Sequence, residues 1–286
     1  MANRDEGARE VIYLNGRFQP LDEARISPLD RGFLYGDGVF TTMRAEQGQV
    51  LYLKDHLTRL NQSFAELKLP ISSLIDWQPT LADLLRKNGL ENDVASVKIL
   101  VSRGQSSLPG LPNPAQATVV IYARRYEPAS ASIYCSGYRL QVFRDAFSPP
   151  LSRLKSLNYL CHLMARQAAM DAGADEAVML DAQGRLAETS AGSLILRTQG
   201  KWWTPRSDYQ LPGITLRHVI RILGEAGLSV ACHSADATAL YSAETVWVLN
   251  SLIGVMPVAQ VDHEPLAKPS PEEADRLRAQ LFERGR

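Results

Sequence analysis

The sequence predicts an α/β protein of two domains. The chain has 286 residues, of which 45% are hydrophobic and 22% charged, so it can bury more than one core. Short β-branched runs alternate along it with segments that have helical spacing. A polar, Pro-containing stretch at Glu127-Pro128-Ala129-Ser130 separates two blocks that could each form a core. We therefore expect a small domain at 1–126, a linker at 127–130 and a larger domain at 131–286.

The first block reads as a small α/β unit. Val11 to Leu14 before Asn15-Gly16 predicts a strand and a tight turn, and Val39 to Leu53, interrupted at Gln47-Gly48, predicts a hairpin. Apolar residues at helical spacing then predict a helix that ends at Pro70. Two further strands are expected at 97–101 and 117–123, and a Gly-, Pro- and Ser-rich loop that could reach a ligand lies between them, at 104–114.

The second block, like the first, contains both expected strands and expected helices. Its expected strands are 140–143, 178–180, 193–196 and 245–249, and its expected helices are 157–172, ended by Gly173, and 215–226, ended by Gly227. Residues 272–284 have the pattern of a charged amphipathic helix, whose charged residues most simply form a solvated face.

Composition excludes several classes of protein. Lys plus Arg and Asp plus Glu each number 31, so the net charge of zero gives no case for nucleic acid or a membrane as the main partner. The start of the chain, Met1 to Glu6, is polar and carries no secretory signal. Three widely spaced cysteines argue against a disulfide framework, and the five histidines have no metal-ligand spacing. A cytoplasmic protein without a metal is expected.

Three elements in order suit one cofactor, pyridoxal 5'-phosphate (PLP). Lys155, at the head of Lys-Ser-Leu-Asn-Tyr-Leu, offers an amine for its aldehyde, and Glu188 offers a partner for its ring nitrogen. The turn Leu211-Pro212-Gly213-Ile214-Thr215 opens a predicted helix, whose free amides together with the Thr215 hydroxyl suit a phosphate. Each element alone would be ordinary, as a surface charge or a turn.

Five motifs together resemble the class IV, fold type IV PLP enzymes. They are Gly36-Asp37-Gly38-Val39-Phe40, His56-Leu57-Thr58-Arg59-Leu60, Lys155-Ser156-Leu157-Asn158, Glu188 and Pro212-Gly213-Ile214-Thr215. The family includes branched-chain aminotransferases, D-amino acid aminotransferases and 4-amino-4-deoxychorismate lyases. The resemblance implies two α/β domains with the active site in the cleft between them, and a homodimer.

The resemblance also implies roles for individual residues. Lys155 would hold PLP covalently and move the proton, Glu188 would pair with the pyridine nitrogen, and Arg59 would bind the phosphate. Further expected cofactor contacts are Tyr159, Ile214, Thr215 and Ser251. The expected substrate contacts are Phe40, Thr42, Arg44, Arg103, Asn250 and Leu252.

The motifs leave the reaction open. Arg103-Gly104 is followed by Gln105 to Pro109, without the arginine and histidine with which D-amino acid aminotransferases bind the substrate carboxylate. The segment Asn250 to Val258, Phe40 to Arg44, and Val97 to Gly104 look more like the lyases. The segment Leu29 to Tyr35 and the tyrosine at 159 look more like the aminotransferases. The sequence thus favours the lyase narrowly over an amino acid transaminase, with a catalytically silent PLP-binding protein as a remote alternative.

Overall fold

The computed structural model describes residues 9–69, 75–113, 116–267 and 271–286. The chain forms a mixed α/β fold and divides into two compact units, of which the first holds 1–127, Lys155–Leu157 and Arg286 and the second holds the rest. The assignment of 1–126, 127–130 and 131–286 to a small domain, a linker and a cofactor-binding domain remains a prediction. No helix within the described ranges is long and apolar enough to cross a membrane.

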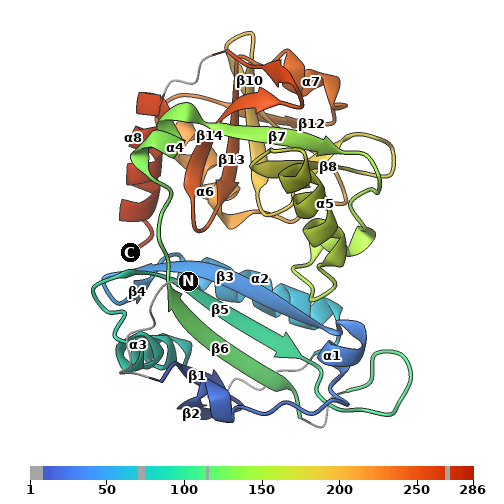
Figure 1. Ribbon diagram of the computed structural model, residues 1–286, viewed down its shortest axis with the longest axis vertical. Helices are drawn as coiled ribbons and strands as arrows, with labels where there is room; N and C mark the ends of the chain where they lie inside the picture. The colour runs from blue at the N-terminus through green and yellow to red at the C-terminus, as the bar shows by residue number, and fades with distance from the viewer. Residues whose placement is uncertain (1–8, 70–74, 114–115, 268–270) are drawn as a thin grey trace. The chain divides into compact units, whose positions relative to one another are not determined.

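The first unit is built on an antiparallel sheet. Among the described residues it has six strands in the order β2-β1-β6-β5-β3-β4. They are β1 (Val11–Leu14), β2 (Arg17–Pro20), β3 (Gly38–Glu46), β4 (Gln49–Val50), β5 (Val94–Ser102) and β6 (Thr118–Arg125). Helices α2 (Leu53–Glu66) and α3 (Trp77–Lys87) lie on one face of this sheet, and α1 (Arg31–Tyr35) lies beside the end of β5 (Figure 1). The short helix η1 (Leu21–Glu23) directly follows β2.

Alternation along the strands gives the sheet two different faces. Val97, Ile99 and Val101 of β5 are fully buried with α2 and α3, but the residues between them are only partly buried. The second face, which we call the open face, carries every other residue of β3, β5 and β6, including Phe40, Thr42 and Lys98. The candidate site residues Phe40 and Thr42 therefore lie on the face of the sheet that does not form the core.

The second unit contains a mixed sheet. Within the described residues the order is β12-β11-β10-β13-β14-β7-β8-β9, with β15 paired to β14. The strands are β7 (Tyr138–Phe143), β8 (Glu176–Leu180), β9 (Leu186–Thr189), β10 (Ser193–Thr198), β11 (Lys201–Pro205), β12 (Val230–His233), β13 (Thr245–Asn250), β14 (Gly254–Val261) and β15 (Glu264–Pro265). Parallel pairing occurs between β7 and β8, β7 and β14, and β11 and β12.

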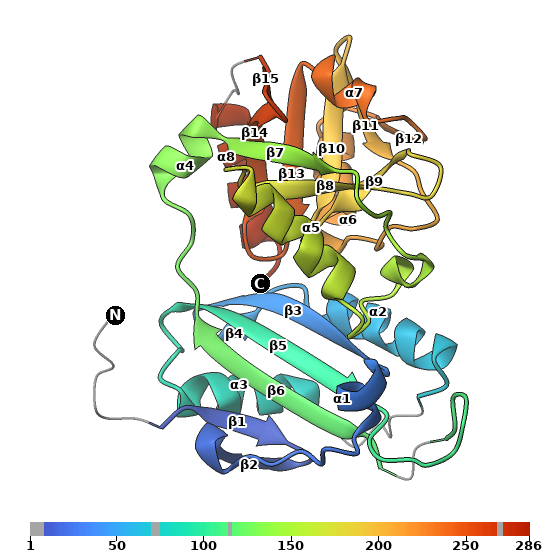
Figure 2. The ribbon, with the colours of Figure 1, turned by 45° about the vertical axis from the view of Figure 1, so that its right-hand side comes forward.

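Helices cover this sheet. Helix α5 (Leu160–Asp171) packs on β7 and β8, and α6 (Ile214–Glu225) packs on β13 (Figure 2). The remaining ones are α4 (Ala131–Ser136), η2 (Pro150–Arg153), α7 (Thr238–Tyr241) and α8 (Pro271–Glu283). The last of these is the amphipathic helix that the sequence predicts, and its Ala274, Leu277 and Leu281 are buried as α8 packs against β14 and α6.

Most predicted elements are present, with shifted ends. The hairpin is confirmed, but its second strand stops at Val50 because Tyr52 takes a left-handed conformation and α2 begins at Leu53. Helix α5 begins at Leu160 rather than 157, since Ser156 is bridged to Val39 of β3 in an extended form. The sequence patterns predict neither α1 nor α3. The predicted helix end at Pro70 and the polar segment Met1 to Glu6 lie outside the described residues.

Candidate active site

Lys155 is placed by backbone pairing with the start of β3. The amide of Phe40 donates to the carbonyl oxygen of Lys155 (2.8 Å), and the amide of Leu157 donates to that of Gly38 (2.9 Å). A Cβ at Gly38 would lie 2.8 Å from a methyl carbon of Leu157 and 2.4 Å from the carbonyl oxygen of Val101. Only glycine allows this approach, which explains why a glycine precedes Val39-Phe40.

Phe40 brings two lysines together. The Lys155 Nζ lies 4.7 Å from the centre of the Phe40 ring, and the Lys98 Nζ lies 4.4 Å from the same centre. Burial lowers the pKa of Lys98 from its ordinary value. No carboxylate pairs with Lys98 in the part of the chain that the structure describes. Sequence reasoning missed Lys98, although its place between the buried Val97 and Ile99 would have put it on the open face.

Arg59 lies on α2 and reaches β3. Its Nη2 donates to the hydroxyl of Thr41 (3.3 Å), and the same hydroxyl lies 2.7 Å from His56 Nδ1. His56 and Arg59 are three residues apart, so they share one face of the helix. Thr41, which the sequence analysis did not single out, thus helps to orient the guanidinium that is expected to hold a phosphate.

Thr42 and Arg44 follow Phe40 on the open face. Thr42 stands opposite Lys98 in the β3–β5 register. Arg44 is buried and forms an ion pair with Glu46 (Nε to Oε1, 2.7 Å). Its guanidinium also lies over the ring of Tyr126, 5.7 Å from the ring centre.

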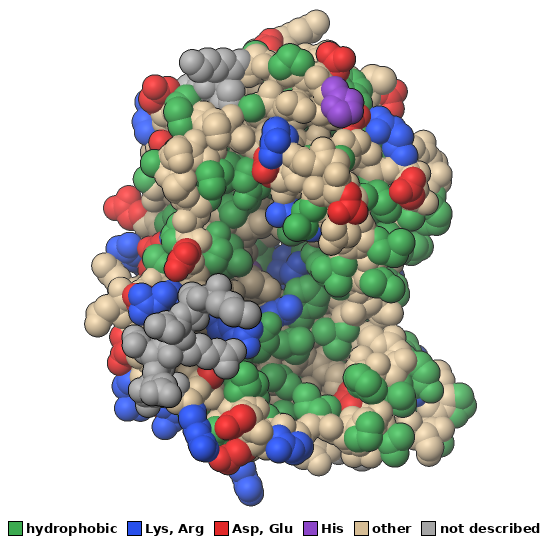
Figure 3. All heavy atoms as spheres, in the orientation of Figure 1, with side chains coloured by type: hydrophobic (Ala, Val, Ile, Leu, Met, Phe, Trp, Pro, Cys, Tyr) green, Lys and Arg blue, Asp and Glu red, His purple; other side chains and the backbone are tan. Residues whose placement is uncertain are grey.

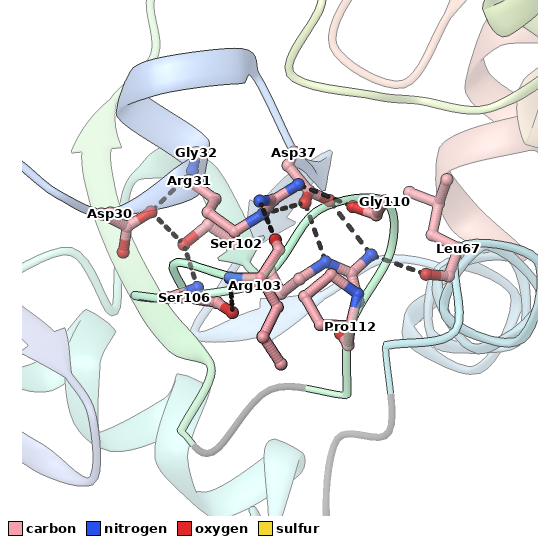
Figure 4. Close-up of polar contacts among 12 residues, drawn as sticks. Asp30, Arg31, Gly32, Asp37, Leu67, Ser102, Arg103, Ser106, Gly110 and Pro112 are labelled. Carbon is pink, nitrogen blue, oxygen red and sulfur yellow. Dashed lines mark hydrogen bonds and ion pairs between the residues drawn. The ribbon is translucent and has the colours of Figure 1, made fainter.

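Arg103 is the centre of a buried polar cluster (Figure 4). It binds both carboxylate oxygens of Asp37 (2.8 and 3.1 Å), and its other donors bind the carbonyl oxygens of Leu67, Lys68 and Pro112. These bonds occupy all five guanidinium donors. The side chain is fully buried, so the geometry argues against the direct substrate contact expected of Arg103 and favours a structural role.

A second arginine completes this cluster. Arg31 Nε donates to Asp37 (2.8 Å), and its terminal nitrogens donate to the carbonyl oxygens of Leu108 and Gly110. Asp37 therefore links the start of β3 to the loop that the sequence singled out as a possible ligand-binding excursion (Figure 4).

Glu188 lies on β9 and is buried. Its Oε1 is 3.3 Å from His162 Nε2, and its Oε2 accepts a hydrogen bond from the amide of Leu211 (3.1 Å). A carboxylate has about four acceptor positions, so each oxygen keeps one for a further donor. This arrangement suits the pairing with a protonated ring nitrogen that the resemblance implies.

Tyr159 caps the N-terminus of α5. Its hydroxyl donates to the carbonyl oxygen of Ser190 (2.8 Å), and its ring stacks on that of His162 with the ring centres 4.5 Å apart. Burial, followed by the Glu188 charge, raises the pKa of Tyr159, so the phenol stays protonated.

The turn before α6 leaves the first amides of the helix without a side-chain cap, although the residues there are buried. Gly213 is the N-cap and provides no side-chain cap, while Ile214 and Thr215 are buried. The first amides of an α-helix have no partner within the helix, and burial without one is costly. A Cβ on Gly213 would lie 2.4 Å from Ser193 Oγ, so a larger residue would require that hydroxyl to move.

The turn between β13 and β14 contains the remaining predicted residues. Asn250 Oδ1 accepts from the amides of Leu252 and Ile253 (both 2.9 Å), and its Nδ2 donates to the carbonyl oxygen of Ala191. Asn250 thereby shapes the turn that presents Ser251 and Leu252.

The predicted residues divide between the two units. The first unit holds Phe40, Thr42, Arg44, Arg59, Arg103 and Lys155, and the second holds Tyr159, Glu188, Ile214, Thr215, Asn250, Ser251 and Leu252. Within the first unit the structure brings Lys155 to Phe40, and within the second it connects Glu188, Tyr159 and the residues before α6.

Comparison with known proteins defines the family. The family model of class IV aminotransferases matches residues 38–261. A "Putative branched-chain-amino-acid aminotransferase" of Methanocaldococcus jannaschii is 33% identical over 88% of both chains. The aminodeoxychorismate lyase of Bacillus subtilis is 29% identical over 88% of this chain and 87% of the lyase. The chain belongs to the class IV aminotransferase family.

Solved structures agree with this family. A branched-chain amino acid aminotransferase of the organism abbreviated T.th., solved with pyridoxamine 5'-phosphate, has a TM-score of 0.85 and 28% identity, with 97% of this chain and 96% of that chain covered. The fold is that of a type IV enzyme, as the sequence predicted. Membership makes the chain a PLP-dependent enzyme, while the relatives span more than one reaction.

Proposed function

We propose that the chain is a PLP-dependent lyase that converts 4-amino-4-deoxychorismate into 4-aminobenzoate and pyruvate. Bound PLP supplies an electron sink for the charge left when a proton leaves the substrate. Lys155 would hold the cofactor through its amine and would carry that proton on Nζ. Two observations fit the cofactor: the buried, uncapped start of α6 suits its phosphate, and Glu188 has acceptor positions to spare for its ring nitrogen.

The other cofactor contacts follow from the family resemblance. Arg59, oriented by Thr41, would add a charge-assisted contact to the phosphate, and Ser251 would add a hydroxyl. Tyr159 would lie beside the cofactor while its hydroxyl still donates a hydrogen bond to the carbonyl oxygen of Ser190.

The environment of Lys98 is the observation that favours aminodeoxychorismate as the substrate. It is a partly buried cation without a carboxylate partner in the described residues. Its ammonium group and that of Lys155 both lie close to the ring of Phe40. A buried charge needs a counter-ion. Aminodeoxychorismate carries two carboxylates, whereas a branched-chain or simple D-amino acid carries one. The second carboxylate would meet Lys98, with Phe40 and Thr42 beside it.

The test compares Lys98→Gln with the matched control Lys201→Gln, which removes an exposed lysine in the second unit. We expect the KM for aminodeoxychorismate to rise about tenfold or more in the first variant, because a lost charge-assisted contact costs about 1.5 to 3 kcal/mol. The control should match the parent. An unchanged KM in Lys98→Gln would remove this support for the lyase.

A second candidate function is amino acid transamination with 2-oxoglutarate or pyruvate as acceptor. The identity to the M. jannaschii protein favours a branched-chain substrate. In this reaction Lys155 Nζ would give back the proton that it had taken, and the substrate would lose its amino group but no other group. A dicarboxylic acceptor such as 2-oxoglutarate could also use Lys98, so turnover measured with and without an acceptor decides between the two reactions.

We also propose a homodimer, in keeping with the family resemblance. Large apolar side chains of α1 and the segment before it are exposed, among them Leu29, Phe33 and Tyr35. Hydrophobic side chains gather in the same part of the first unit in Figure 3. Beside them lies a cavity of about 420 Å³ whose lining includes Ile26, Phe33 and Leu100. A second copy that covers this surface would remove it from water.

Three cysteines, Cys135, Cys161 and Cys232, are free thiols. Free thiols suit a reducing compartment, so we keep the cytoplasm as the proposed location.

A further inference from the structure

Helix α5 directs three polar side chains toward the ends of β8 and β9. Tyr159, His162 and Arg166 are spaced three and four residues apart, so they share one face of the helix. Tyr159 binds the carbonyl oxygen of Ser190, His162 contacts Glu188, and Arg166 forms an ion pair with Glu176 (2.7 Å). The helix therefore contacts the start of β8 and the end of β9, the strand that carries Glu188.

We propose that His162 is a positioning residue that fixes the carboxylate of Glu188 through an Nε2–H donor. This inference rests on the role proposed for Glu188. An ionised carboxylate only accepts hydrogen bonds, so the proton of the shared bond belongs to His162 Nε2. Both Glu188 oxygens then have one fixed donor each, from His162 and from Leu211.

The other ring nitrogen supports this tautomer. His162 is 6% exposed, and its Nδ1 is buried with no hydrogen-bond partner among the described residues. A proton on Nδ1 would be a buried donor without an acceptor, a state that carries a desolvation penalty. The neutral ring with its proton on Nε2 avoids that penalty and satisfies Glu188.

A stacked ring holds the imidazole in place. The Tyr159 ring stacks on it with an interplanar angle of 8° and is itself fixed by the bond to Ser190. Ser190 Oγ donates to the buried carboxylate of Glu176, which also accepts from the amide of Ala177 and pairs with Arg166. Rotation of His162 away from Glu188 would break the stack, so the donor stays aimed at the carboxylate.

The first experiment determines the tautomer of His162 by NMR and does not depend on enzyme activity. The cofactor-loaded protein is prepared with ¹⁵N-labelled histidine, and the His162 signal is assigned by its loss in His162→Gln. The chain has five histidines, so the spectrum is simple. We expect a neutral ring with the proton on Nε2, and a shift of that signal in Glu188→Gln. A ring protonated on Nδ1 alone, or a signal that Glu188→Gln leaves unmoved, would overturn the proposal.

The second experiment uses a conservative rescue. His162→Leu removes the donor at similar size, and His162→Gln replaces it with an amide N–H at a similar distance from the backbone. We expect turnover to fall about ten- to a hundredfold in His162→Leu, with KM changed less than kcat, and to recover largely in His162→Gln. His233→Gln, at an exposed histidine, is the control.

The outcomes separate this inference from the function on which it rests. Equal loss in His162→Leu and His162→Gln, or full activity in His162→Leu, would overturn the positioning role. If Glu188→Gln turns over like the parent, the proposed role of Glu188 fails, while the NMR measurement still decides whether His162 donates to it.

Discussion

The backbone amide of Phe40 donates to the carbonyl oxygen of Lys155, and the Phe40 ring lies under the ammonium group of that same lysine. One residue of β3 thus fixes both the backbone and the side chain of Lys155. The glycine two positions earlier, Gly38, allows the approach. The backbone of Lys155 is therefore positioned by pairing with a strand of the sheet.

The first prediction concerns Lys155 itself. The purified protein should be yellow, and Lys155→Ala should abolish turnover while the circular dichroism spectrum stays that of the parent. Borohydride reduction followed by peptide mapping should find the reduced cofactor on Lys155. Cofactor attached to any other lysine would show that this assignment is wrong.

Substitutions of Arg59 and Glu188 should affect different steps, cofactor binding for Arg59 and proton abstraction for Glu188. Arg59→Ala should mainly weaken PLP binding, since loss of a charge-assisted phosphate contact costs about 1.5 to 3 kcal/mol. Glu188→Gln should keep the cofactor and slow proton abstraction, because a neutral amide no longer favours a protonated ring nitrogen. Cofactor dissociation constants and single-turnover rates distinguish the two. Weak cofactor binding in both variants, with normal rates when saturated, would contradict the division of roles.

Asp37 should contribute stability that depends on pH. Burial raises the pKa of its carboxyl, but hydrogen bonds and charge from Arg103 and Arg31 outweigh burial and hold the pKa below its ordinary value of 3.8. A group with a lowered pKa stabilises the fold above the unfolded value and loses that effect as the pH falls toward the folded value. Asp37→Asn should therefore lower the urea midpoint at pH 7 and lower it less below pH 3.8.

The control for this prediction is Asp83→Asn. Asp83 pairs with Arg86 on the surface of α3, and exposed pairs contribute only about 0 to 1 kcal/mol. Its urea midpoint should stay near that of the parent both at neutral pH and in acid. A loss of stability in Asp37→Asn that is the same in acid and at neutral pH would show that the charge of Asp37 is not what matters.

The exposed surface of α1 should be an interface between two copies. Phe33 is 78% exposed. Phe33→Asp should reduce the mass in sedimentation equilibrium from twice the chain mass toward 31.6 kDa, because a buried unpaired charge opposes association. Leu228→Asp, at an exposed leucine of the second unit, should leave the mass unchanged. A parent protein that sediments as a monomer would contradict the proposed dimer.

Strand and helix periodicity predicted most of the fold. The alternation at 97–101 is confirmed by β5, and the helical spacing of Leu57, Leu60 and Phe64 by α2. Helix α1 was missed because it has five residues, too few to show a period. The amphipathic helix expected at 272–284 is confirmed by α8, whose buried residues are Ala274, Leu277 and Leu281.

Local motifs identified candidate site residues but not their partners. The Arg103 side chain looked like a substrate contact, yet its acceptors come from Asp37 and from backbone carbonyls at 67, 68 and 112, which no local pattern reveals. Lys98 and His162 were missed for a similar reason. Their importance depends on a neighbour from another element, Phe40 for one and Glu188 for the other.

The most direct test of the proposed function is pyruvate release from 4-amino-4-deoxychorismate with and without 2-oxoglutarate. β-Elimination regenerates the cofactor in every cycle, whereas transamination stops after one half-reaction unless a keto acid accepts the amino group. The same assay is run with L-branched-chain amino acids and with D-alanine. The lyase account predicts continuous pyruvate release from aminodeoxychorismate alone, unaffected by the acceptor. Acceptor-dependent turnover of an amino acid, with no pyruvate from aminodeoxychorismate, would contradict it and establish the transaminase.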